Sequence, residues 1–317
     1  MKISVIGCGR WGAFLAWYLD GHSHEVTLYG RQNSKHFQAF LDNRTNGLTT
    51  LSPRVRLTSD LNETLHGEVI VISVNSQGLR SLMGEIRAQT NEPKLFVLCM
   101  KGLETGSGKR LSEIVIENAP LGSRVAVWLG PGHVQEFTAG IPNCMVIDSP
   151  DSDVKSMLVD VFSSELIRFY YGSDMIGNEV GAAAKNVIGI AAGVLDALQL
   201  SSLKGALCSR GTHEVARLIK AMGGNPNSAY GLCHLGDYAA TVFSPLSHNR
   251  RFGEAFVKNE PYDKLAEGVD TLKAMKFLSQ KYGAELPICD AVYDALFLGL
   301  DPQKAVERLF DRSLKTE

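Results

Sequence analysis

Residues 174–198 read DMIGNEVGAAAKNVIGIAAGVLDAL, and this stretch decides how the chain is divided. Its apolar residues recur at the i, i+3, i+4, i+7 spacing of an amphipathic helix, which predicts one long helix packed along an apolar face. Strand-like segments precede it, and only helix-like segments follow it. The sequence therefore predicts two domains, residues 1–175 and residues 176–317.

Lys185 lies off the predicted apolar stripe of this helix. Its neighbours on the helix surface would be Gly181, Gly189 and Ala192, so the ammonium group would stand in a trough with almost no side-chain walls. Such a trough lets a small molecule, or another backbone, come close. The alternative is an ordinary surface lysine on a tightly packed helix.

Composition narrows the class of protein. The 317 residues are 44% apolar and have a formal net charge of -2, and the sequence pI is about 6.5. These values indicate a globular chain with no general attraction to nucleic acid or to anionic membrane. The six cysteines show neither C-x-x-C nor zinc spacing, so we predict no metal site and buried thiols. With no signal peptide or membrane-span pattern in the sequence, the cytoplasm is the expected location.

The N-terminal segment KISVIGCGRWG, residues 2–12, has the pattern of a strand, a glycine turn and a helix start. In this context Gly7 permits the tight turn, Gly9 lets backbone N–H groups approach a pyrophosphate, and Gly12 lets the helix pack closely on the strand. We therefore assign this turn, with Arg10 and Trp11, to the binding of a dinucleotide cofactor.

The second predicted strand, residues 25–29, is followed by Gly30-Arg31 instead of the acidic residue typical of NAD-specific domains. An arginine there can pair with a 2′-phosphate, which favours NADPH over NADH. Alternatively, Arg31 stacks on the adenine or meets solvent.

Further strand-like runs at residues 69–74, 95–99, 124–129, 144–147 and 166–170 predict a doubly wound, mainly parallel sheet. Ligands bind beyond the carboxyl ends of such strands. Lys101 lies at one of these ends, and the segment 130–133 at another.

The second half predicts helices near residues 202–223, 252–259, 262–282, 285–297 and 302–312. The loop between residues 231 and 253 is rich in glycine and in groups able to bind an anion. These groups are Asp237, Thr241, Ser244, Ser247, His248, Asn249, Arg250 and Arg251.

Read together, these segments resemble the NAD(P)-dependent glycerol-3-phosphate dehydrogenase family over nearly the whole chain. The motifs that carry the resemblance are G-C-G-R-W-G, M-K-G-L-E at 100–104, G-P-G-H at 130–133, E-V-G-A-A-A-K-N-V-I-G-I-A-A-G at 179–193, L-G-D at 235–237 and S-H-N-R-R-F-G at 247–253. The resemblance implies an N-terminal Rossmann-type domain, an all-helical C-terminal domain, and an enzyme of phospholipid synthesis.

The resemblance also implies residue roles. Lys185, Lys101 and Asp237 match the catalytic set. The implied substrate contacts are Lys101, Gly130, Asn186, Thr241, His248, Asn249 and Arg250. The implied cofactor contacts, beyond the glycine turn and Arg31, are Lys101, Arg250 and Glu267.

Four positions depart from the family pattern, namely His248 for arginine, Gly132 for serine, His234 for glycine and Leu203 for asparagine. Loss of the arginine bears on the affinity for a phosphate.

We therefore predict interconversion of dihydroxyacetone phosphate and sn-glycerol 3-phosphate with NADP or NAD, NADPH being favoured. In this scheme Lys101 depresses the pKa of Lys185, and Asp237 fixes the direction of that lysine. The alternatives are a reductase of another small keto acid or hydroxy acid, and a nicotinamide-binding sensor without turnover. The expected partner is a small phosphate substrate, and a homodimer is the expected assembly.

Overall fold

The structure is a computed structural model that describes residues 1–313. The chain splits into two compact units, one of Met1–Met100 with Leu111–Met175, the other of Lys101–Arg110 with the chain from Ile176 onward. The segment Lys101–Arg110 thus belongs to the second unit, which a single boundary after residue 175 does not allow. Residues 314–317 of the predicted second domain lie outside the described residues.

The first unit contains one sheet in the order β3-β2-β1-β4-β5-β6-β7-β8, and only the β6/β7 pair is antiparallel within the described chain. The predicted doubly wound sheet is confirmed. The strands are β1 Lys2–Ile6, β2 Glu25–Tyr29, β3 Arg56–Thr58, β4 Val69–Ile72, β5 Leu95–Leu98, β6 Arg124–Leu129, β7 Asn143–Asp148 and β8 Ile167–Tyr171.

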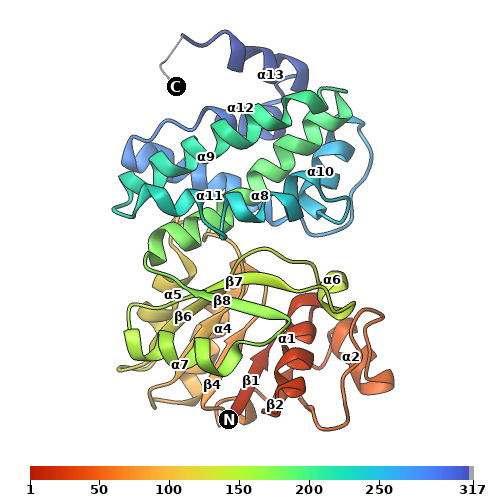
Figure 1. Ribbon diagram of the computed structural model, residues 1–317, viewed down its shortest axis with the longest axis vertical. Helices are drawn as coiled ribbons and strands as arrows, with labels where there is room; N and C mark the ends of the chain where they lie inside the picture. The colour runs from red at the N-terminus through yellow and green to blue at the C-terminus, as the bar shows by residue number, and fades with distance from the viewer. Residues whose placement is uncertain (314–317) are drawn as a thin grey trace. The chain divides into compact units, whose positions relative to one another are not determined.

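Burial explains why the central strands read as continuous apolar runs. All residues of β4 and β5 are buried, as expected for parallel strands covered by helices on both faces. Strand β3 was not predicted, because three residues are too few to show a period of two. The helices around the sheet (Figure 1) are α1 Arg10–Gly21, α2 Lys35–Asn43, α3 Leu61–Thr64, α4 Leu79–Gln89, α5 Leu111–Asn118, α6 Val134–Thr138 and α7 Ser152–Phe162.

The second unit is helical, as predicted (Figure 1). Short turns of helix, η2 Ser201–Leu203, η3 Pro226–Tyr230, η4 Leu235–Asp237 and η5 Ala239–Phe243, connect the longer elements. The predicted loop 231–253 is therefore partly helical, and its last residues form the start of α10, where Ser247 caps the N–H of Arg250. The long helices are α8 Met175–Ala197, α9 Lys204–Ala221, α10 His248–Val257, α11 Glu267–Tyr282, α12 Pro287–Leu298 and α13 Pro302–Phe310.

Helix α8 is buried on all sides, not along one stripe. Every residue from Gly177 to Leu195 is buried, and Lys185 is only 8% exposed. The trough around Lys185 is filled by other parts of the chain, since a Cβ on Gly189 would lie 2.7 Å from Thr241 and one on Gly193 would lie 1.9 Å from the carbonyl oxygen of Arg250. Of the two predicted approaches to this face of the helix, that of another backbone occurs at Gly193, one turn beyond Gly189.

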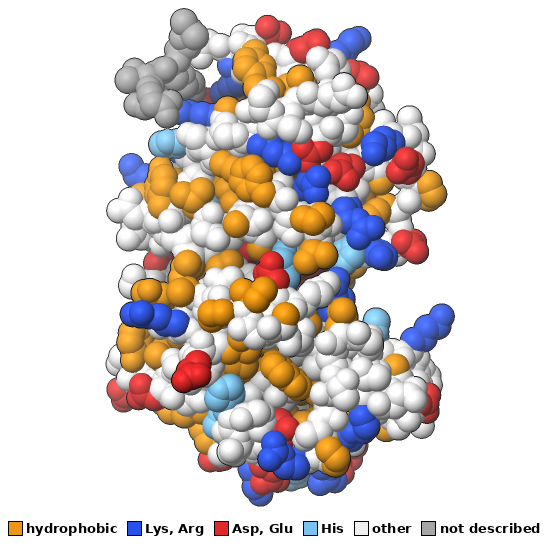
Figure 2. Space-filling view, turned by 45° about the vertical axis from the view of Figure 1, so that its right-hand side comes forward, with side chains coloured by type: hydrophobic (Ala, Val, Ile, Leu, Met, Phe, Trp, Pro, Cys, Tyr) orange, Lys and Arg blue, Asp and Glu red, His pale blue; other side chains and the backbone are white. Residues whose placement is uncertain are grey.

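By length and composition, α8 is also the one helix among the described residues that could cross a membrane, but 89% of its most apolar window is buried inside the protein. On the face shown in Figure 2, Lys and Arg side chains alternate with Asp and Glu and do not gather into one basic patch.

Candidate active site

The glycine turn of the first unit has the geometry that its sequence predicts. Gly7 has a φ of +112°, and a Cβ there would lie 2.2 Å from the carbonyl oxygen of Ser73 beyond β4. A Cβ on Gly12 would lie 1.9 Å from the carbonyl oxygen of Gly7. Both positions therefore need glycine to bring the start of α1 onto the ends of β1 and β4.

Gly9 differs from these two glycines, because no described atom lies within 4 Å of a Cβ built on it. It is the N-cap residue of α1, and no side chain among the described residues caps this helix end. A helix N-terminus beside open space fits a pyrophosphate group, which the backbone N–H groups would bind.

The remaining residues of the turn begin α1. Arg10 is its first residue. The Trp11 ring packs against Phe14 and Phe137, with ring centroids 5.0 Å and 6.2 Å apart. Their assignment to the cofactor stays a prediction.

Arg31 lies on the surface beyond β2. Its side chain is 69% exposed, and its Nη2 atom is 3.1 Å from Oε1 of Glu85. Exposed ion pairs of this kind contribute little, so the guanidinium group can turn toward a ligand at small cost. Gly30 is required for packing, because a Cβ there would meet the Phe37 ring at 2.4 Å.

The segment after β6 explains one departure from the family pattern. Gly132 has a φ of +145°, and a Cβ there would lie 2.2 Å from the ring of Phe137, so a serine would not fit. Gly130, the predicted substrate contact, has a φ of +135° and packs against Met145.

In the second unit, one buried carboxylate binds two lysines. Oδ2 of Asp237 is 2.6 Å from Nζ of Lys101 and 3.0 Å from Nζ of Lys185. The Asp237 side chain is 1% exposed, and those of Lys101 and Lys185 are 19% and 10% exposed. Asp237 therefore contacts both lysines of the predicted catalytic set, and the catalytic role of the three residues stays a prediction.

Burial lowers the pKa of Lys185 to about 8; Asp237 opposes this shift, and Lys101 adds to it. The predicted cause, repulsion by Lys101, is thus real but smaller than desolvation. Glu267, the predicted cofactor contact at the start of α11, is half-buried, and burial raises its pKa to about 7 against the opposing effect of both lysines.

Two segments close around this cluster. Thr241 of η5 accepts a hydrogen bond of 2.7 Å from Nζ of Lys185. Asn249 of α10 donates to Oδ1 of Asn186 at 3.0 Å and accepts from the N–H of Gly268 at 2.9 Å. Thr241 thus contacts Lys185 directly, and Asn249 contacts Asn186, the next residue of α8; their roles toward a substrate stay predictions.

Two buried atoms of this cluster have no hydrogen-bond partner among the described residues, the amide nitrogen Nδ2 of Asn186 and Oδ1 of Asp237. Buried polar groups are nearly always paired. One is a donor and the other an acceptor, so each is available to a ligand group of the opposite kind.

His234 is the residue before η4. The sequence marks it only as a departure from the family pattern and predicts no role for it. It is fully buried, with Nδ1 2.8 Å from the carbonyl oxygen of Gly181 and Nε2 2.7 Å from the hydroxyl of Tyr238. Burial lowers its pKa to about 4, so the ring is neutral at physiological pH. It joins α8 to the turn that carries Asp237.

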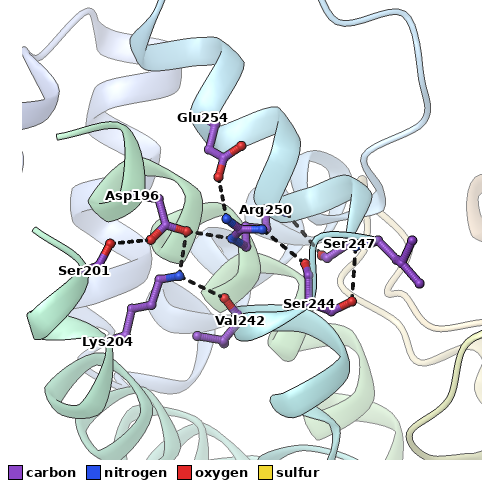
Figure 3. Close-up of polar contacts among 9 residues, drawn as sticks. Asp196, Ser201, Lys204, Val242, Ser244, Ser247, Arg250 and Glu254 are labelled. Atoms are coloured by element: carbon purple, nitrogen blue, oxygen red, sulfur yellow. Dashed lines mark hydrogen bonds and ion pairs between the residues drawn. The ribbon is translucent and has the colours of Figure 1, made fainter. Parts of the chain in front are cut away.

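His248 and Arg250 have other contacts than the sequence suggested. Nδ1 of His248 is 2.7 Å from the hydroxyl of Tyr262. The guanidinium group of Arg250 is held by Asp196 and Glu254 (Figure 3).

Comparison with known proteins places both units in one family. Residues 2–155 match the family model described as NAD-dependent glycerol-3-phosphate dehydrogenase N-terminus, and residues 174–307 match the model for its C-terminus.

Relatives of similar length are named glycerol-3-phosphate dehydrogenase [NAD(P)+]. That of Macrococcus caseolyticus is 33% identical, with 100% of both chains covered, and that of Geobacillus kaustophilus is 36% identical, with 100% of this chain and 96% of the relative covered. Among solved structures, glycerol-3-phosphate dehydrogenase from Coxiella burnetii is 29% identical, with a TM-score of 0.90 over 98% of this chain and 99% of that one.

Proposed function

The chain belongs to the NAD-dependent glycerol-3-phosphate dehydrogenase family, and from this premise we propose that it interconverts dihydroxyacetone phosphate and sn-glycerol 3-phosphate with NAD(P)H. The observation that carries the proposal is the pair of lysine ammonium groups bound to the single buried carboxylate of Asp237. Reduction adds a hydride to the carbonyl carbon and a proton to the carbonyl oxygen, and the product serves phospholipid synthesis.

The first unit supplies the cofactor site. Gly7 and Gly12 shape the turn, and Gly9 leaves space for the pyrophosphate at the start of α1. Arg31 is the residue for a 2′-phosphate, which supports a preference for NADPH. When bound, the nicotinamide supplies the hydride.

Lys185 is the proton donor for the ketone oxygen. Its pKa of about 8 leaves it mostly charged at neutral pH yet able to lose its proton, which suits a general acid near the working pH. Asp237 and Thr241 fix the direction of the ammonium group through contacts of 3.0 Å and 2.7 Å. In the reverse direction the neutral amine accepts the proton from the alcohol.

Lys101 supplies a second positive charge, which stabilises the developing oxyanion and attracts the phosphate. The two ammonium groups interact with the Asp237 carboxylate and with Glu267, whose pKa of about 7 leaves its carboxyl group only partly charged at neutral pH, so an excess of positive charge remains. We assign Nδ2 of Asn186 to an oxygen of the substrate and Oδ1 of Asp237 to a substrate hydroxyl, because both atoms are buried and have no partner among the described residues.

The test is oxidation of NADPH and NADH by the purified protein with dihydroxyacetone phosphate, followed at the absorbance of the reduced nicotinamide, with the product identified as sn-glycerol 3-phosphate. Turnover of a keto acid in place of the phosphate substrate would contradict the proposal. Binding of NADPH without any turnover would favour a sensor.

A cytoplasmic location also stays a proposal. All six cysteines are free thiols, which supports a reducing compartment. A homodimer is the proposed assembly, and light scattering of the purified protein tests it.

A further inference from the structure

One carboxylate near the end of α8 gathers polar groups from three other segments (Figure 3). Oδ2 of Asp196 accepts hydrogen bonds of 2.6 Å from Nζ of Lys204 and 2.6 Å from Nε of Arg250, and Oδ1 accepts one of 2.7 Å from Ser201. The Asp196 side chain is only 13% exposed. Burial alone would raise the pKa of Asp196, but the bonds from Lys204, Ser201 and Arg250 outweigh it and hold the pKa below its usual value.

The two cations extend this network to the segments that follow. Nζ of Lys204 also donates to the carbonyl oxygen of Val242 in η5, at 3.3 Å. Nη1 of Arg250 donates to the carbonyl oxygen of Ser244 at 3.3 Å, and Nη2 donates to Glu254 at 2.7 Å. All three nitrogen atoms of this guanidinium group thus bind protein acceptors.

Each anchored segment carries a residue of the active-site cluster. Thr241, which accepts from Lys185, precedes Val242, and Asn249, which donates to Asn186, precedes Arg250. Helix α10 packs directly against the backbone of α8, because a Cβ on Gly253 of α10 would lie 2.2 Å from the carbonyl oxygen of Ile190. A small shift of η5 or α10 would therefore change the surroundings of Lys185.

We propose that Asp196 is a positioning residue for the reaction, which holds Thr241 and Asn249 against Lys185 and Asn186 by way of Lys204 and Arg250. Arg250 then acts through Asp196 and Glu254 and does not contact the phosphate or the cofactor. This inference rests on the proposed function and adds to it the residues that set the geometry of the substrate site.

Charge balance makes the proposal testable. Lys204 and Arg250 are 11% and 17% exposed and share one oxygen of Asp196. Removing that negative charge leaves two partly buried cations that repel each other, and this repulsion pushes η5 and α10 away from α9. Adding Lys204→Met to Asp196→Asn removes one of the two positive charges and with it the repulsion. The remaining charge, that of Arg250, keeps its ion pair with Glu254.

The experiment compares wild type, D196N, the double variant D196N/K204M, and D290N. Asp290 is the control for the loss of a carboxylate that pairs with a lysine, because its Oδ1 atom is also 2.6 Å from Nζ of Lys276 in the same unit; its side chain is 39% exposed, against 13% for Asp196. We measure kcat and KM for dihydroxyacetone phosphate, and hydrogen exchange of the amides of residues 239–250, at a temperature at which circular dichroism shows each variant to be folded.

We expect D196N to lose at least about tenfold in kcat/KM and to exchange faster in residues 239–250, as repulsion in a partly buried site would cause. The double variant should fall between D196N and wild type, and D290N should match wild type. If D196N does not fold, the test rests on the double variant D196N/K204M. Wild-type kinetics and wild-type exchange rates in the double variant would overturn the proposal. A double variant no better than a folded D196N would also overturn it.

Arg250→Lys separates the positioning role from direct contact. If Arg250 contacted the phosphate directly, R250K would raise KM for dihydroxyacetone phosphate and D196N/K204M would leave this KM unchanged. That pair of results would contradict the proposal. Should wild type fail to reduce dihydroxyacetone phosphate, the proposed function would fail, and the order of exchange rates in residues 239–250 would still test the role of Asp196.

Discussion

Nζ of Lys185 lies 3.0 Å from Oδ2 of Asp237, and the same oxygen also binds Lys101 at 2.6 Å. A single carboxylate therefore compensates two ammonium groups in a buried site. Desolvation disfavours the charged form of the buried lysine and lowers the pKa of Lys185 to about 8, while the contact with Asp237 opposes this shift and fixes the direction of the ammonium group.

The pH dependence of turnover follows from this pKa. Below about pH 8 Lys185 is charged, so kcat/KM for ketone reduction should be flat there and fall about tenfold per pH unit above it. Oxidation of sn-glycerol 3-phosphate needs the neutral amine and should rise through the same range. Initial rates in both directions from pH 6 to pH 10 check this. A reduction profile that stays flat to pH 10 would falsify the assignment.

Lys185→Met should remove turnover and keep the fold. Methionine replaces the apolar stem of the buried lysine, and Asp237 keeps its partner Lys101 at 2.6 Å. We expect kcat to fall at least about a thousandfold, as loss of an acid and of charge stabilisation predicts. Lys276→Met, at the lysine that pairs with Asp290, is the control and should keep wild-type kcat. A K185M variant with more than about a tenth of wild-type kcat would show that another group supplies the proton.

Arg31→Asp should reverse the cofactor preference. Arg31 is exposed, so the change costs no packing, and a charge-assisted bond to a 2′-phosphate corresponds to roughly 1.5–3 kcal/mol, about tenfold to a hundredfold in affinity. Glu85→Gln frees Arg31 from its ion pair and should raise the affinity for NADPH modestly. Fluorescence titrations with both cofactors measure these values. A wild-type preference for NADH of tenfold would refute the role of Arg31.

His248→Arg should change how KM depends on pH. A histidine, unlike an arginine, can lose its positive charge near neutral pH, so a phosphate contact through it weakens as pH rises. We expect KM of wild type for dihydroxyacetone phosphate to rise with pH more steeply than substrate ionisation explains, and H248R to flatten the rise with little change in kcat. Tyr262→Phe, which removes the 2.7 Å contact to Nδ1, should weaken binding if Tyr262 orients the ring. Identical profiles for H248R and wild type would mean that His248 does not touch the phosphate.

Glu214 should make stability depend on pH. Its carboxylate is fully buried and accepts from the N–H groups of Ile288 and Cys289 at the start of α12. Burial raises its pKa to about 7 in the folded state. The folded protein therefore binds a proton that the unfolded chain has lost, and this contribution, up to roughly 3 kcal/mol, is present below about pH 4.5 and is lost as pH rises through 7. Denaturant unfolding from pH 5 to 8 measures the slope, and Glu214→Gln should reduce it. An equal slope in both proteins would contradict this.

Local patterns in the sequence were enough to predict the features that depend on backbone conformation and on burial, namely the glycine turn, the central strands and the start of the helical unit. Gly7 and Gly12 are needed because no side chain fits between the ends of β1 and β4 and the start of α1, and that need shows in the spacing of the glycines. The apolar runs of β4 and β5 show burial on both faces, and the loss of strand patterns after residue 171 marks the helical unit.

The tertiary structure decided which charged groups act on one another. Lys101, Lys185 and Asp237 are far apart in the sequence, and only the fold makes one oxygen of Asp237 their common partner. Segment Lys101–Arg110 belongs to the second unit although it follows a strand of the first, and no periodicity shows this. The resemblance to the family implied that Arg250 contacts the substrate and the cofactor, but successive helical residues point about 100° apart, so Asn249 bonds to Asn186 while its neighbour Arg250 bonds to Asp196. The sequence by itself thus determined which residues are available for the chemistry, and packing against α8 decided which of them touch, because contact between residues far apart in the sequence depends on how the second unit folds around this buried helix.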